Sequence, residues 1–119
     1  MRRGAWVALV IVGGAVPWAS SSHGQDLMPA SFDCGKARTW VEKTICRNPE
    51  LADRDGRMAA AYRDLVEQAR EGGGPDADLS NFQREQRAWL KARNRCRTTA
   101  CIAEAYDRRI NEVTVDYDE

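Results

Sequence analysis

Histidine is almost absent from this chain of 119 residues, and its one histidine, His23, lies near the N-terminus. Beyond residue 24 the serines are Ser31 and Ser80 alone. The chain therefore lacks the base that a Ser–His or Cys–His nucleophile pair requires. No Gly-rich segment follows a strand pattern, so no phosphate-binding loop is predicted, and no pair of carboxylates stands out from the many acids. We predict no catalytic residues and do not expect an enzyme.

A long hydrophobic run is lacking too. The one apolar run covers residues 5–16, follows the basic residues Arg2 and Arg3, and is short for a membrane span. Small residues come next, so we predict a signal peptide over residues 1–24 and no stable membrane anchor. No cysteine ends the run, so no lipoprotein-type attachment is expected. The protein should be periplasmic or secreted; an uncleaved anchor is the alternative.

Charge of one sign is not in excess either. The chain has 18 Lys and Arg against 18 Asp and Glu. Removing the predicted signal peptide takes away Arg2 and Arg3, which leaves 16 basic against 18 acidic residues and a net charge of −2. Such a chain lacks the basic field of a nucleic-acid-binding protein, so no nucleic-acid partner is predicted. The remaining residues are enough for one small domain.

Cysteine is present in an even number, and all four lie in the exported part: Cys34, Cys46, Cys96 and Cys101. In an oxidising compartment this predicts two disulfides. Of the three possible pairings we expect the local ones, because Cys96 and Cys101 flank one predicted corner. A zinc site is the competing interpretation, but histidine ligands are lacking beyond the cleavage region. We predict no metal and no cofactor.

The rest of the chain has helical patterns throughout, with no strand pattern. Capping boxes at Thr39 and Ser80 and the Asn48-Pro49 pair mark three helix starts. A last helix starts at Thr98 or Thr99. We predict an all-α fold, a small disulfide-stapled bundle of one short and three longer helices. Residues 25–31 should be a flexible lead-in, 32–113 the helical domain, and 114–119 an acidic disordered tail.

The interior should contain both aromatic and polar side chains. Trp89 is the largest apolar residue on its helix face, and we expect it at the centre of the core. Four polar residues lie on or beside apolar stripes, which suggests an Asp–Arg–Gln network tying the helices together. A binding role for the same residues is the alternative. The predicted interior set is Trp40, Asp55, Tyr62, Gln86, Trp89, Arg93, Tyr106 and Arg109.

A row of basic residues follows one helix face. Arg84, Arg87, Lys91 and Arg95 recur at steps of three and four residues, so they lie beside the apolar stripe. One interpretation is contact with an anionic partner, such as an acidic cleft or a wall polymer. The other is a solvated helix face with no partner. We keep this row as the candidate contact surface.

Several segments, taken in order, carry a family resemblance. They are Ser31-Phe-Asp-Cys34-Gly-Lys, Val41-Glu-Lys-Thr-Ile-Cys46, Asn48-Pro-Glu-Leu-Ala-Asp-Arg-Asp55, Ala59-Ala-Ala-Tyr62, Gln86-Arg-Ala-Trp-Leu-Lys-Ala-Arg93, Cys96, Cys101 and Tyr106-Asp-Arg-Arg-Ile110. Together they resemble the lysozyme inhibitor LprI-like N-terminal domain family over about residues 32–113. The resemblance implies an exported helical domain of bacterial envelopes and a protein partner, lysozyme or a related muramidase. An envelope stress or interaction module without lysozyme contact is the alternative.

Overall fold

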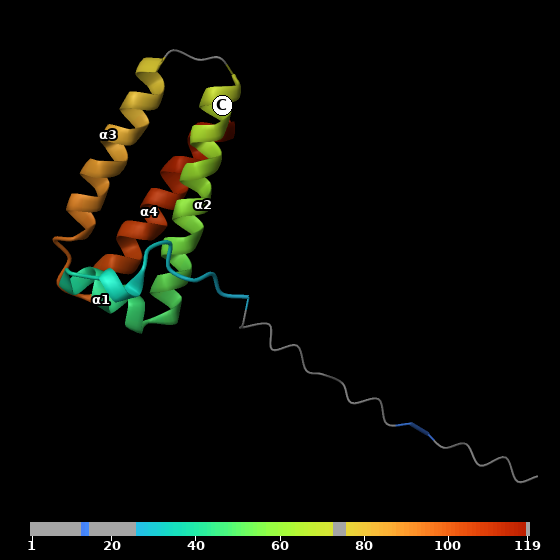
Figure 1. The fold of residues 1–119 in the computed structure, drawn as a ribbon, viewed down its shortest axis with the longest axis vertical. Coiled ribbons are helices and arrows are strands. Elements are labelled where there is room, and N and C mark those ends of the chain that lie inside the picture. The colour runs from blue at the N-terminus through green and yellow to red at the C-terminus, as the bar shows by residue number, and fades with distance from the viewer. Residues whose placement is uncertain (1–12, 15–25, 73–75, 119) are drawn as a thin grey trace, which may run out of the picture.

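The computed structural model describes residues 13–14, 26–72 and 76–118 (Figure 1). The described part holds one short 3₁₀ turn and four α-helices, with no strand. The elements are η2 (Cys34–Lys36), α1 (Trp40–Arg47), α2 (Pro49–Glu71), α3 (Asp76–Arg93) and α4 (Thr99–Asp118). The predicted all-α fold is therefore confirmed. The predicted signal peptide falls outside the described residues, except for residues 13–14.

Three of the four predicted helix starts have the expected caps. At the start of α1, the Thr39 hydroxyl oxygen accepts from the Glu42 backbone N–H at 3.0 Å. At the start of α2, the Asn48 side chain accepts from two backbone N–H groups, at 3.1 and 3.3 Å. At the start of α4, the Thr98 hydroxyl oxygen accepts from the Cys101 backbone N–H at 3.1 Å. The third start is wrong: α3 begins at Asp76, so Ser80 lies inside the helix. Residues 76–79 contain no helix breaker, and acidic residues suit a first helical turn.

The three long helices run side by side (Figure 1). The chain ascends α2, descends α3 and ascends α4, so α3 is antiparallel to the other two. Helices α2 and α4 form the most extensive contact, and α3 packs less closely against both. Helix α1 lies across the end where α2 begins.

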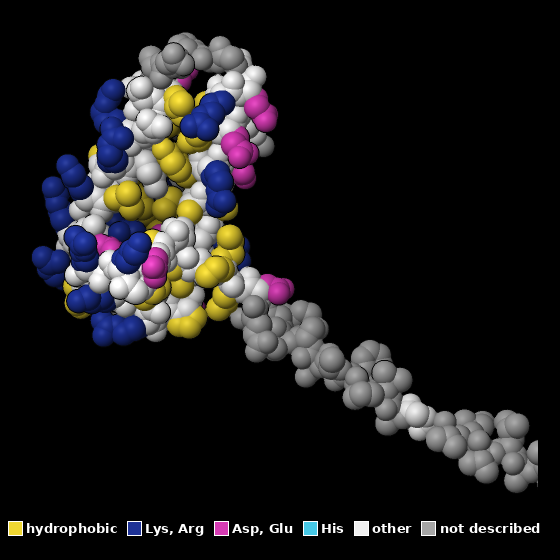
Figure 2. Space-filling view, viewed as in Figure 1, with side chains coloured by type: hydrophobic (Ala, Val, Ile, Leu, Met, Phe, Trp, Pro, Cys, Tyr) yellow, Lys and Arg dark blue, Asp and Glu magenta, His cyan; other side chains and the backbone are white. Residues whose placement is uncertain are grey.

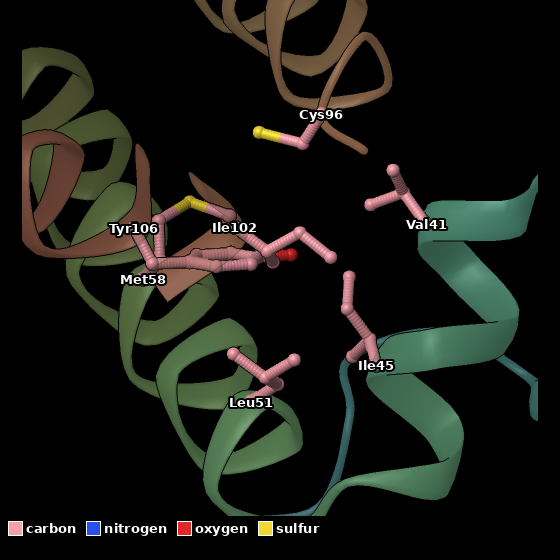
Figure 3. Close-up of a cluster of buried hydrophobic side chains, with 7 residues drawn as sticks. All are labelled: Val41, Ile45, Leu51, Met58, Cys96, Ile102 and Tyr106. Atoms are coloured by element: carbon pink, nitrogen blue, oxygen red, sulfur yellow. The ribbon is translucent and has the colours of Figure 1, made fainter. Parts of the chain in front are cut away.

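The core lies between α1, α2 and α4 (Figure 3). Its fully buried apolar side chains are Val41 and Ile45 of α1 and Ile102 and Tyr106 of α4. Trp89 is only partly buried at the edge of this cluster, so its expected central place is wrong. The centre is Tyr106, because α4 packs along α2 whereas α3 stands further out.

Trp40 was expected in the interior and is instead 45% exposed. It is the first residue of α1, and the buried positions of that helix are Val41 and Ile45. The spacing of the two buried residues sets the inward face, and Trp40 falls off it. This residue is therefore corrected to the surface.

Both predicted disulfides are present. Cys34 bonds to Cys46, which ties η2 to α1, and Cys96 bonds to Cys101, which closes the corner between α3 and α4. No cysteine is left free. One disulfide therefore holds the 3₁₀ turn against α1, and the other holds the corner between α3 and α4.

Residues 28–31, which we call the strap, differ from the flexible lead-in expected there. The Met28 N–H donates to the Asp53 carboxylate at 2.8 Å, and the Ser31 N–H donates to Asp55 at 2.6 Å. Where the strap crosses α2, a Cβ on Gly56 would lie 2.6 Å from the Pro29 carbonyl oxygen. The strap is fixed because two inward carboxylates hold its backbone and a glycine leaves it room.

Helix α4 continues to Asp118, past the boundary at residue 113. The Thr114 hydroxyl donates to the Ile110 carbonyl oxygen at 2.7 Å, inside the same helix. No glycine or proline follows Val113, so nothing in the sequence ends the helix there. The backbone of residues 114–118 is helical rather than an irregular tail.

Candidate protein-binding surface

A buried polar cluster joins three helices and the strap. The Tyr106 hydroxyl of α4 donates to Asp55 of α2 at 2.7 Å and accepts from Arg93 of α3 at 2.9 Å. Arg93 also approaches the Asp55 carboxylate at 3.8 Å. The other Asp55 oxygen accepts from the Ser31 hydroxyl at 2.7 Å. Burial raises the pKa of Tyr106 well above its usual range, so its hydroxyl stays protonated.

A second buried polar group lies nearer the start of α3, at Gln86. The Arg109 guanidinium of α4 donates to the Gln86 side-chain oxygen through Nε at 3.1 Å and Nη2 at 3.0 Å. The Gln86 amide in turn donates to the Met58 sulfur of α2 at 3.2 Å. The polar residues expected to form one network thus lie in two adjacent groups. Each group bridges α2, α3 and α4.

These groups offer no free acid, base or nucleophile. Among the described residues, every buried side-chain nitrogen or oxygen has a hydrogen-bond partner. The partner of Arg93 outside the core is Asn94, whose oxygen accepts from it at 2.8 and 3.1 Å. In the described part of the chain, no cluster of His, Cys, Asp or Glu could hold a metal ion. The buried groups therefore join α2, α3 and α4 to one another.

The remaining predicted interior residues lie at the margin of the core. Trp89 packs edge-on against Tyr106, with ring centroids 5.1 Å apart, and its indole N–H donates to the Ala105 carbonyl at 3.3 Å. Tyr62 is partly buried and packs against the same core. Trp40 lies apart from this set on the surface.

Between α2 and α3 lies an open groove (Figure 2). It consists of two hollows of about 590 and 330 Å³. Both are lined by Ser31, Ala59 and Tyr62, which makes them one continuous groove. Figure 2 shows hydrophobic side chains along its floor. Since α3 packs loosely on α2, this apolar strip is left open to solvent.

The predicted basic row runs beside this groove. Arg84, Arg87, Lys91 and Arg95 are all exposed, and Figure 2 shows basic side chains along the outer side of α3. The groove-lining residues of α3 include Gln83. Arg87 follows Gln83 by one helical turn and so lies at the rim.

Sequence patterns did not indicate the α2 side of the groove. Arg63 and Arg70 line it there, together with Val66. The signal was present as the Ala59-Ala-Ala run, because a small residue at position 59 leaves a hollow instead of a packed contact. Recognising that hollow requires knowing that α3 lies opposite.

Within the described residues, no helix is both long and apolar enough to cross a bilayer. A comparison with protein families matches residues 34–113 to the family described as Lysozyme inhibitor LprI. Lipoprotein LprI of Mycobacterium bovis and of Mycobacterium tuberculosis is 25% identical to this chain over 89 residues. That alignment covers 71% of this chain and 41% of those relatives, so the chain spans about two-fifths of their length. No solved structure matches the chain.

The family match includes η2, α1, α2 and α3 completely and most of α4. It therefore covers both disulfides and, apart from Ser31 and Phe32, the two buried polar groups and the α2–α3 groove. The resemblance predicted from the sequence is confirmed, and the chain belongs to the lysozyme inhibitor LprI family.

Proposed function

We propose that this protein is exported and inhibits a lysozyme, or a related muramidase, by direct protein–protein contact. The observation that carries the proposal is the family match over residues 34–113, since that family is one of lysozyme inhibitors. Two disulfides and no free cysteine suit an oxidising compartment outside the cytoplasm. The buried charged side chains all have hydrogen-bond partners, which suits a rigid protein that binds its partner through its outer surface.

The basic row on α3 is the contact surface that we assign to this function. Three of its four exposed cations stand on α3, whose inner face is fixed by Arg93 and Gln86, and Arg95 lies in the turn directly after that helix. Cations held in this way favour an acidic surface on the partner and speed the encounter. A muramidase that works through two carboxylates offers such a surface in its cleft.

A turbidity assay tests the proposal. Bacterial cell walls are mixed with each of several lysozymes, with and without the purified mature protein, and clearing is followed by light scattering. We expect the protein to slow clearing by at least one lysozyme in proportion to its concentration. The matched control is the same protein after disulfide reduction and alkylation, which should lose the effect.

Two outcomes would contradict the proposal. If the folded protein slows none of the lysozymes, or binds one without slowing it, the inhibitory function is wrong. If the protein alone releases soluble fragments from peptidoglycan, after removal of copurifying hydrolases, it is an enzyme instead. Mass spectrometry of the supernatant detects such fragments directly.

A further inference from the structure

The α2–α3 groove has the dimensions of a binding site for a short polypeptide segment. Its two hollows of about 590 and 330 Å³ join at Ala59 and Tyr62. Ligand-binding clefts commonly have volumes of about 300–1,000 Å³. The groove runs between two parallel walls, so it fits an elongated occupant better than a compact one.

The walls of the groove are held in place from inside the protein. At its inner hollow, Asp55 and Gln86 contribute to the lining, and both take part in buried hydrogen bonds to α4. Arg93 lines the same hollow and is fixed by Tyr106. The separation of α2 and α3 is therefore set before any partner arrives, which lowers the entropic cost of binding.

The exposed charged side chains that line the groove are two arginines and one glutamate. Arg63 and Arg70 line the α2 side. On the α3 side, exposed Arg87 lines neither hollow but lies at the rim, one helical turn after the lining residue Gln83. The acids that line it are mostly engaged: Asp55 bonds to Tyr106, and Glu42 accepts from the Thr39 hydroxyl at 3.0 Å. The exposed exception is Glu67. The groove thus combines apolar side chains at its floor with arginine side chains along its two edges.

We propose that this groove binds a protein segment in which an apolar side chain is flanked by carboxylates. The apolar side chain covers the floor at Ala59 and Val66, and the carboxylates meet guanidinium groups at both edges. Arginine suits this role because its planar fork can pair with a carboxylate through two hydrogen bonds. This proposal depends on the proposed function in one respect: the protein that presents the segment is then a lysozyme or a related muramidase.

The first test uses a small anionic aromatic probe, anilinonaphthalene sulfonate, on the folded mature protein. We expect it to bind with enhanced fluorescence and to be displaced by the peptide acetyl-Glu-Asp-Phe-Glu-Asp-amide. The matched peptide acetyl-Lys-Lys-Phe-Lys-Lys-amide should not displace it. No probe binding, or equal displacement by the two peptides, would overturn the proposal.

Substitutions then locate the site. Ala59→Trp fills the groove floor and should weaken probe binding by at least about tenfold, because a bulky residue occupies the anchor position. The control is Ala60→Trp, on the next residue of α2, which lines neither hollow. Arg63→Glu combined with Arg87→Glu should weaken acidic-peptide binding while circular dichroism stays unchanged. If Ala59→Trp and Ala60→Trp behave alike, the groove is not the site.

The lysozyme assay separates this proposal from the proposed function. If the wild type inhibits a lysozyme, Ala59→Trp should lose inhibition and Ala60→Trp should keep it. Should no lysozyme be inhibited while the acidic peptide still binds in the groove, the proposed function fails and the groove proposal stands. Full inhibition by a folded Ala59→Trp variant would overturn the groove as the inhibitory contact.

Discussion

Asp55 is the residue on which the interior depends most. It is 1% exposed, yet it accepts hydrogen bonds from the strap and from α4 and faces a guanidinium of α3. A buried carboxylate without such partners would be strongly destabilising. Its position on the apolar stripe of α2 predicted the need for a partner, and Arg93 was identified as a candidate. Tyr106 was predicted to lie in the interior, but its hydrogen bonds to Asp55 and Arg93 were not predicted, because a tyrosine on an apolar face does not show which polar group it meets.

Replacing Arg93 tests this cluster. We expect Arg93→Ala to lower the free energy of unfolding by about 3–5 kcal/mol, since Asp55 is left as a buried charge without its cation. The exposed Arg95→Ala is the control and should change stability by less than about 0.5 kcal/mol. Urea unfolding followed by circular dichroism measures both. Equal stability of the two variants would mean that the buried cluster does not stabilise the fold.

The effect of a side chain at Gly56 cannot be judged from the local helix pattern alone. A glycine inside a helix normally costs about 1 kcal/mol relative to alanine. Here a Cβ would lie 2.7 Å from the Met28 Cβ and 2.6 Å from the Pro29 carbonyl oxygen. Neither contact is visible in the sequence, because the strap crosses α2 from a segment that has no periodic pattern.

The effect of Gly56→Ala on the free energy of unfolding should therefore have opposite signs with and without the strap. In the mature protein it should lower the free energy of unfolding by about 1–3 kcal/mol, through overpacking. In a shortened chain that begins at Phe32, the same change should raise it by about 1 kcal/mol, through helix propensity. Thermal and urea unfolding of the four proteins measures both effects. An identical change in both backgrounds would contradict the strap contact.

At the scale of elements, most helices and the disulfides could be predicted, whereas the start of α3 and the ordered strap could not. Helices α1 and α2 follow from caps and apolar spacing, and the Cys96–Cys101 disulfide follows from the corner that its two cysteines flank. The start of α3 was placed five residues late, at 81 instead of 76, since a serine that resembles a cap can also lie inside a helix. The strap was missed because its order comes from side chains of α2 and not from its own sequence.

The attachment of the strap should depend on pH. The Met28 N–H, which donates to Asp53, holds the pKa of that carboxyl below its ordinary value, and the nearby Arg57 adds to the effect. A lowered pKa in the folded state means that the stabilisation is present above the unfolded value, near pH 4, and is lost as the pH falls through the folded value.

Nuclear magnetic resonance can follow this release. We expect the Met28 amide shift to titrate with a midpoint below 3.8, the ordinary value for aspartate. Asp53→Asn keeps an acceptor oxygen but removes the titration, so its amide shift should lack this transition. A midpoint at or above the ordinary value would show that the strap does not hold the carboxylate.

Over the whole molecule, a net charge near zero conceals a separation of charge. The basic row follows α3 and the turn after it, whereas exposed acids such as Asp64 and Glu71 lie on the second half of α2, where Figure 2 also shows acidic side chains. Composition correctly gave no global basic field, but it cannot show where charges gather. A local field of this kind steers an acidic partner and weakens as salt screens it.

Reversing the row tests whether this field acts in binding. We expect Lys91→Glu with Arg95→Glu to weaken lysozyme inhibition by about tenfold or more at low salt, because two attractive contacts become repulsive. The control, Lys36→Glu with Arg108→Glu, changes net charge equally at exposed sites outside the row and should inhibit nearly as well as the wild type. Raising the salt concentration should reduce the difference between the two variants, since screening removes the local field but not the apolar contact in the groove. If both double variants lose inhibition alike, overall charge and not the α3 surface governs the encounter.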